Sequence, residues 1–141
     1  MTALAQDSPP LTAGEADLLI SLGSVVLVAC GLLAIGVARL TATGRLGVNG
    51  WAGIRTKATR HSEAAWLAGH QAAEKLLVSV GLLIIASAAI GVYVSSTADP
   101  TDGERRALLW SGTVVAGSIA VVAVTALAAS RANRAARQAA T

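Results

Sequence analysis

Three long blocks of apolar residues alternate with short polar segments along the chain. The blocks cover about residues 18–40, 76–94 and 108–129, and each approaches the roughly 20 apolar residues that cross about 30 Å of hydrocarbon as a helix. No segment between or beside them is long enough to bury a core of its own. The pattern therefore predicts an all-α integral membrane protein, with three transmembrane helices packed in one membrane domain of residues 18–130.

The composition fits a chain that lies mostly in lipid. Of the 141 residues, 54% are hydrophobic and 13% are charged, whereas soluble domains carry about 25% charged residues. The centres of the blocks hold no Asp, Glu, Lys, Arg or His, so the usual marker of an intramembrane proton or ion path is missing. We expect no cofactor and no attached soluble enzyme domain.

Lys and Arg are distributed unequally among the polar segments. None precedes the first block, six lie between or beside the first two blocks, two lie between the second and third, and three follow the third. Because Lys and Arg in short loops resist translocation, this asymmetry predicts that residues 41–75 and a basic tail of residues 131–141 are cytoplasmic. Residues 1–17 are then an extracytoplasmic tail, and its part from Met1 to Gly14, with two adjacent prolines, is expected to be disordered.

The predicted location is therefore the cell membrane, crossed several times, with the N-terminus outside and the C-terminus in the cytoplasm. The net charge of +3 is explained by topology and by contact with anionic membrane lipid, and we expect no nucleic-acid partner.

Cys30 lies inside the first block, and the chain has no other cysteine. An intrachain disulfide is excluded, and we expect Cys30 to be a small buried hydrophobe. In an alternative interpretation, the residues around Cys30 resemble a lipobox, and everything before Cys30 is a cleaved signal. We favour an uncleaved first span, because the preceding residues are acidic rather than basic and the apolar run continues to Ala38.

Small residues recur at every fourth position of the third block, at Gly112, Ala116 and Ala120. Such residues let helix backbones approach closely in lipid, where apolar burial does not drive association. The stripe predicts a packing seam, either within the chain or between the copies of a homo-oligomer, because the same motif serves both.

The segment between the first two blocks has the most distinctive pattern. Its glycines, Gly44, Gly47, Gly50 and Gly53, break any helix, and Thr56, Thr59 or Ser62 can each cap a new one. Ser62, Trp66 and His70 then recur at every fourth residue and share one helix face. Trp51 and Trp66 suit the headgroup depth at which amphipathic rings settle. The pattern predicts a short interfacial helix that enters the second span, with Trp66 as an interface anchor.

The arrangement G-I-R-T-x-x-T-x-x-S-x-x-x-W-x-x-x-H runs from Gly53 to His70. It resembles the signature of the SdpI family of bacterial membrane proteins, whose members place this segment between transmembrane helices. The family's namesake protects a toxin-producing cell from its own secreted antimicrobial peptide and also holds a transcriptional repressor at the membrane. The resemblance implies an immunity or signalling protein that binds a peptide toxin or a cytoplasmic regulator. This chain departs from the signature at Lys57, where Pro is common, and at Gln71, where Arg is frequent.

Eight residues of this segment are the candidate binding residues. They are Asn49, Gly53, Arg55, Thr56, Thr59, Ser62, Trp66 and His70. The planar fork of Arg55 suits a lipid phosphate or an acidic patch on a partner, and Thr56 beside it can complete an anion site at a helix start. The alternative is that Arg55 only adds to the positive charge that keeps this segment in the cytoplasm. His70 is either a pH-sensitive or ligand-binding group or, as we favour, a hydrogen-bonded structural residue.

No metal site and no catalytic residue are expected. His61 and His70 stand nine residues apart, on opposite sides of a continuous helix. Glu63 and His70 leave a small lipid-processing enzyme as the least favoured alternative. The main alternative is an accessory structural subunit of a larger membrane complex.

We expect the function to reside in the cytoplasmic segment and not in the external loop, because so many polar groups near the headgroups are costly unless they bind each other or a ligand.

Overall fold

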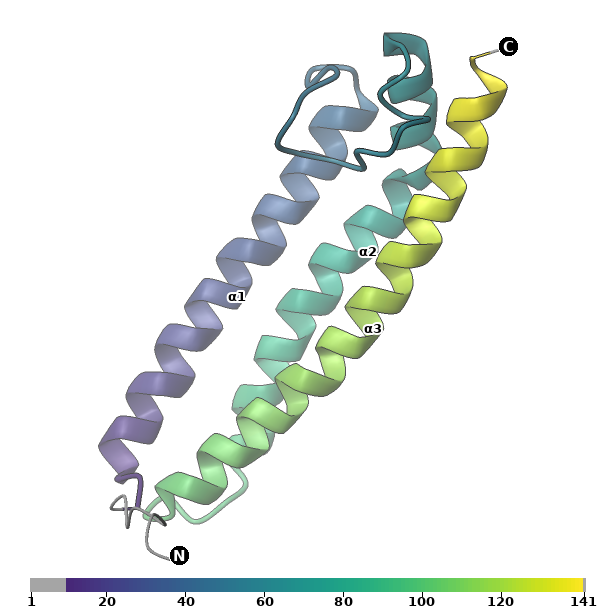
Figure 1. Ribbon diagram of the computed structural model, residues 1–141. Coiled ribbons are helices and arrows are strands. Elements are labelled where there is room, and N and C mark those ends of the chain that lie inside the picture. The colour runs from purple at the N-terminus through teal and green to yellow at the C-terminus, as the bar shows by residue number, and fades with distance from the viewer. Residues whose placement is uncertain (1–9, 141) are drawn as a thin grey trace, which may run out of the picture.

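The computed structural model describes residues 10–140, which form an elongated bundle of antiparallel helices (Figure 1). The helices are α1 (Ala13–Ala42), α2 (Glu63–Ser95) and α3 (Gly103–Gln138). Each predicted span lies within one of these helices, and each helix contains a stretch long and apolar enough to cross a membrane. The all-α fold and the three apolar helices expected from the sequence are therefore confirmed.

Side-chain caps determine where each helix begins. The Thr12 hydroxyl accepts the backbone N–H of Glu15 at 3.3 Å, and the Glu15 carboxylate accepts the N–H of Thr12 at 3.0 Å, which completes a capping box before α1. Ser62 caps α2 and Asp102 caps α3 by accepting the N–H of the residue three positions on. Of the three hydroxyl residues that could cap the second helix, Ser62 is the one that does so.

The expected short interfacial helix before the second span is not present among the described residues, and that part of the prediction is wrong. Residues 63–75 are the first turns of α2 itself. They contain no Pro and a single glycine, Gly69, and most of the others favour a helix. Nothing ends the helix between its Ser62 cap and the apolar stretch that begins at Leu76, so the two parts are continuous.

Helix α1 begins before the first apolar block, and helix α3 continues beyond the third. Residues 1–9 of the expected disordered tail lie outside the described residues, and its last two, Ala13 and Gly14, belong to α1, so the prediction is wrong there. At the other end, α3 continues to Gln138, so most of the basic tail is helix. Its last turns pack beside the segment that joins α1 to α2 (Figure 1).

Close contact between helices depends on glycines. A Cβ built on Gly31 of α1 would lie 2.7 Å from the carbonyl oxygen of Gly81 on α2, and one built on Gly81 would lie 2.5 Å from the carbonyl of Gly31. A Cβ on Gly117 of α3 would overlap Ser87 Oγ of α2. Helix α2 therefore approaches both neighbours through positions without a side chain, as expected for association in lipid.

The stripe of Gly112, Ala116 and Ala120 is not the seam within the chain. Gly112 and Ala116 are exposed, and a Cβ on Gly112 would meet no atom within 4 Å. The buried face of α3 is defined by residues such as Ala128. At about 100° per residue, Gly112 points roughly 160° away from Ala128, whereas Gly117 points only about 20° away. The prediction that this stripe packs within the chain is therefore wrong. The alternative, that it packs between two copies of a homo-oligomer, stays a prediction.

Cys30 is exposed on α1, so the expected buried position is wrong. Its neighbour Gly31 faces α2, and adjacent residues of a helix point about 100° apart. Helix α1 is continuous through Cys30, and Ala16 and Ile20, which precede it, are buried in the bundle. Residues before Cys30 thus take part in the packing of the bundle.

The outer faces of the bundle are strongly apolar. Large side chains such as Leu33, Ile119 and Val122 are 68%, 69% and 68% exposed. Soluble monomers rarely expose so extended an apolar surface. These faces suit hydrocarbon, with the polar segments at the two ends of the bundle.

The orientation can be tested with single cysteines in a Cys30→Ala background. Gly50 and Thr101 lie at opposite ends of the bundle, both are exposed, and a Cβ on Gly50 would meet no atom within 4 Å. From the Lys and Arg asymmetry, a membrane-impermeant maleimide applied to intact cells should modify the Thr101→Cys protein and spare the Gly50→Cys protein. Both should react after the cells are permeabilised. Labelling of Gly50→Cys alone in intact cells would reverse the orientation.

Candidate functional site

The candidate residues lie at the end of the bundle where α1 ends, α2 begins and α3 ends (Figure 1). We call residues 43–62, which join α1 to α2, the connecting segment. It has no regular helix, yet it is folded against α2 and α3 by side-chain hydrogen bonds.

His70 is the buried centre of the site. Its ring Nε2 accepts the backbone N–H of Ile54 at 2.9 Å, and its Nδ1 lies 2.8 Å from the carbonyl oxygen of Trp66. Because a carbonyl only accepts, Nδ1 carries the proton and Nε2 is free to accept, which defines a neutral imidazole. The Trp66 and His70 ring centroids are 4.2 Å apart. Both ring nitrogens are therefore used inside the protein, in the hydrogen-bonded structural role favoured from the sequence.

Gly53 makes the approach of Ile54 to His70 possible. Its φ is +84°, in the left-handed region where a side chain is strained. A Cβ at this position would also lie 2.5 Å from His70 Nε2. The glycine is thus required twice, once for its backbone conformation and once for space.

Thr56 and Thr59 fold the next turn of the connecting segment and tie it to α3. The buried Thr59 hydroxyl donates to the Ile54 carbonyl at 2.6 Å and accepts the N–H of Thr56 at 3.0 Å. The Thr56 hydroxyl in turn accepts the N–H of Thr59 at 3.2 Å and donates to the side-chain oxygen of Asn133. A residue of α3 therefore completes the site.

Asn49 and Trp66 hold the first half of the connecting segment. The Asn49 side-chain oxygen accepts the N–H groups of Trp51 at 3.0 Å and Ala52 at 2.8 Å, as in turns stabilised by an Asn side chain. Trp66 Nε1 donates to the Leu46 carbonyl at 2.9 Å. Trp66 is 1% exposed, so its expected role as a headgroup anchor is wrong: the helix face that carries it points into the connecting segment.

Arg55 differs from the other candidates. Its side chain is exposed and forms no hydrogen bond or ion pair with any described residue. Thr56 beside it is engaged with Thr59 and Asn133, and α2 begins only at Glu63. The Arg55 and Thr56 pair therefore does not stand at a helix N-terminus, the geometry expected for an anion site there.

Two contributors to this site were not identified from the sequence. Thr41 of α1 is fully buried, donates to the Val37 carbonyl at 2.8 Å, and packs its methyl group toward Gly53. Asn133 of α3 accepts from Thr56. Thr41 carries no signal that separates it from a helix-end threonine, whereas Asn133 is an isolated amide among alanines and arginines and is a reasonable marker of a contact.

The geometry offers little for catalysis or metal binding. Within residues 10–140, no three His, Cys, Asp or Glu side chains are placed to hold a metal ion. His61 is exposed, whereas His70 is fully buried with both nitrogens engaged. A Glu63 and His70 pair is therefore not presented to a substrate in this structure.

The chain matches a known protein family. The model of the SdpI/YfhL protein family matches residues 45–130, which is more than half of the chain and includes all eight candidate residues. No curated protein and no solved structure matches the chain. The resemblance seen in the motif from Gly53 to His70 is confirmed by this match.

Replacing Gly53 tests the packing around His70. Gly53→Ala should lower the free energy of unfolding by roughly 1–3 kcal/mol from backbone strain alone, with a further loss from the clash with His70 Nε2. The matched control is Gly50→Ala, where the added methyl group meets no atom within 4 Å and should change stability little. Thermal unfolding of the purified proteins in detergent, followed by circular dichroism, measures the difference. Equal melting temperatures for the two variants would contradict the arrangement.

Protonation of His70 should destabilise the site. His70 lies before the apolar stretch of α2, and burial lowers its pKa from the ordinary value of 6.5. At pH values between the pKa of His70 in the folded protein and 6.5, the unfolded chain binds more protons than the folded chain. The free energy of unfolding is therefore highest above this window and falls as the pH decreases through it. A protonated ring also has no acceptor for the Ile54 N–H. Melting temperatures measured from pH 8 to pH 5 should fall.

The control for this prediction is the other histidine. His61→Gln leaves both hydrogen bonds of the His70 ring in place and should keep the pH dependence. His70→Gln should be less stable at pH 8 and respond less to acid. The carboxylates of Glu15 and Asp99 have pKa values lowered by hydrogen bonds with Thr12 and Thr101, so they titrate below this range. An unchanged pH response in His70→Gln would assign the effect to another group.

Proposed function

The chain belongs to the SdpI/YfhL family, and on this basis we propose that it is a multi-pass membrane protein that acts by binding, in immunity against a membrane-active peptide toxin or in signalling through a cytoplasmic regulator. The observation that carries the proposal is the division of roles within the connecting segment. Its buried polar residues bind one another, and Arg55 is left exposed and unpaired on the ordered surface that they make. Exposed groups held by a rigid scaffold are typical of recognition sites.

The chemistry of this surface suits an anionic or amphipathic partner. The guanidinium of Arg55 presents a planar fork that matches a carboxylate or phosphate. Trp51, four residues earlier in the same segment, is 73% exposed and adds a large apolar face with a polar edge. Arg and Trp are enriched among the residues that dominate binding energy in interfaces. Partner binding through these two side chains is the mechanism we propose.

We also propose that the protein is not an enzyme. Support comes from His70, the strongest candidate base, which is buried and uses both ring nitrogens inside the fold. A general base must reach the proton that it removes, and a ring enclosed in this way does not.

A second candidate function is that of an accessory subunit in a larger membrane complex. The observation that favours it is the outward position of Gly112 and Ala116 on α3, where both are exposed among the described residues. Small residues on an outer helix face allow another transmembrane helix, from a second copy or another protein, to pack closely. This role is compatible with the binding surface at Arg55.

Deletion of the gene in its native host tests the immunity proposal. The deletion strain should become more sensitive to membrane-active peptides from related strains, and the wild-type gene should restore protection. Arg55→Lys should insert normally but restore protection poorly, because Lys keeps the charge and loses the fork. Loss of a charged hydrogen bond worth about 1.5–3 kcal/mol predicts a tenfold or larger loss of affinity.

The matched control for this experiment is Arg45→Lys, an exposed arginine of the same segment. It should restore protection fully. Full protection by Arg55→Lys, combined with loss of protection on scrambling the loop from Asp99 to Glu104, would place the functional surface at the other end of the bundle. Unchanged sensitivity of the deletion strain with a stable co-purifying membrane complex would favour the subunit function. A change in lipid composition that depends on His70 would favour an enzyme.

A further inference from the structure

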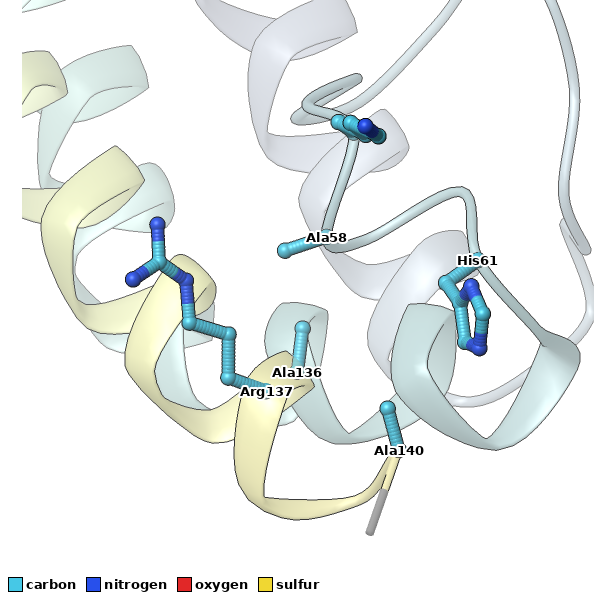
Figure 2. Close-up of a pocket in the computed structure, with 6 residues that line it drawn as sticks. Ala58, His61, Ala136, Arg137 and Ala140 are labelled. Atoms are coloured by element: carbon cyan, nitrogen blue, oxygen red, sulfur yellow. The ribbon is translucent and has the colours of Figure 1, made fainter.

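A pocket separate from the Arg55 surface lies between the connecting segment and the end of α3 (Figure 2). Its volume is about 310 Å³. The lining residues are Lys57, Ala58 and His61 from the segment and Ala136, Arg137 and Ala140 from the end of the chain. Alanines supply the small apolar part of this lining, and the larger side chains are basic or titratable.

The positive charge around this pocket has no counterion in the described part of the chain. The two ion pairs found there join Arg39 to Glu74 and Arg106 to Asp17, and neither includes a residue of the pocket. The lining contains no acidic residue. Lys57 and Arg137 therefore place two cations without a counterion around one cavity, and an anion bound there would relieve their repulsion.

The pocket lies near the depth of lipid headgroups. Arg137 is eight residues beyond the end of the third apolar block, which is about 12 Å along a helix. Helical side chains lean back toward the helix N-terminus, so the guanidinium reaches toward the membrane. The headgroup layer extends roughly 5–8 Å beyond the hydrocarbon on each side. An anionic headgroup is thus within reach of Arg137, in the pocket that Lys57 also lines.

We propose that this pocket binds the phosphate of an anionic phospholipid headgroup, with Arg137 and Lys57 as its cationic contacts. The guanidinium of Arg137 can bind two phosphate oxygens at once, and the Lys57 ammonium acts as a point charge from the opposite element. Basic pockets between transmembrane helices on the cytoplasmic side are typical sites for anionic lipid headgroups. The bound lipid would bridge the connecting segment and α3, the same two elements that the Thr56 and Asn133 side chains join. The proposal does not depend on the immunity or signalling function.

The test uses the purified full-length protein in a neutral detergent, titrated with phosphatidylglycerol and, for comparison, with phosphatidylcholine. Native mass spectrometry counts the bound lipids. Each cation at an anionic lipid surface contributes a factor of about five to affinity, so Lys57→Gln and Arg137→Gln should each raise the dissociation constant for phosphatidylglycerol about fivefold, and the double variant about 25-fold. Binding of phosphatidylcholine should be weaker and insensitive to these changes.

The matched control is the double variant Arg60→Gln with Arg131→Gln. Both arginines are exposed and come from the same two elements, but neither lines the pocket. This control should bind phosphatidylglycerol like the wild type. A charge-keeping variant, Lys57→Arg with Arg137→Lys, should also retain binding, which separates loss of charge from loss of folding.

Three results would overturn the proposal. Equal loss of affinity in the control variant would show a diffuse attraction to the whole basic end. Unchanged affinity in the Lys57→Gln and Arg137→Gln double variant would show that the lipid binds elsewhere. Displacement of phosphatidylglycerol by millimolar inorganic phosphate, or by an acidic peptide, would assign the pocket to a soluble anion or a protein partner. Retention of the lipid in the presence of both competitors supports the headgroup.

Discussion

The connecting segment is organised around one buried acceptor, the Nε2 atom of His70. It takes the backbone N–H of Ile54, while the hydroxyl of Thr59 satisfies the carbonyl of the same residue. Ile54 is itself buried, so either polar group left without a partner would cost about 1–3 kcal/mol. Gly53 must then adopt a positive φ beside the ring, and the neutral tautomer must be held by the Trp66 carbonyl. Each of these conditions depends on the same hydrogen bond.

This arrangement explains how a segment without regular secondary structure can cap a helical bundle. The hydroxyls, the amide and the rings that would otherwise demand water are used internally, and Asn133 extends the network to α3. The groups that remain exposed include the Arg55 guanidinium, the Trp51 indole and the basic residues of a pocket. Exposed groups on an ordered base are typical of recognition sites.

Three of the wrong predictions share one cause, because each concerns which way a residue of a correctly predicted helix points. Trp66 was assigned to the right helix face, but that face is covered by the connecting segment and does not meet the headgroups. Cys30 and the stripe beginning at Gly112 lie on the expected helices and face outward. An all-apolar helix carries little amphipathic signal, so its sequence does not indicate which side meets protein and which meets lipid.

The sequence by itself determined the local features: three apolar helices, the breaks at the glycines, a hydroxyl cap at Thr56, Thr59 or Ser62, and the family motif from Gly53 to His70. These depend on neighbouring residues, on the length of an apolar run or on a fixed spacing, all of which can be read along the chain. Only the tertiary structure decided that His70 meets Ile54, that Thr56 meets Asn133 across 77 positions of sequence, and that Lys57 and Arg137 share a pocket. Such contacts depend on the rotation and register of packed helices, which are set by close approach at a few glycines and not by any pattern within one segment.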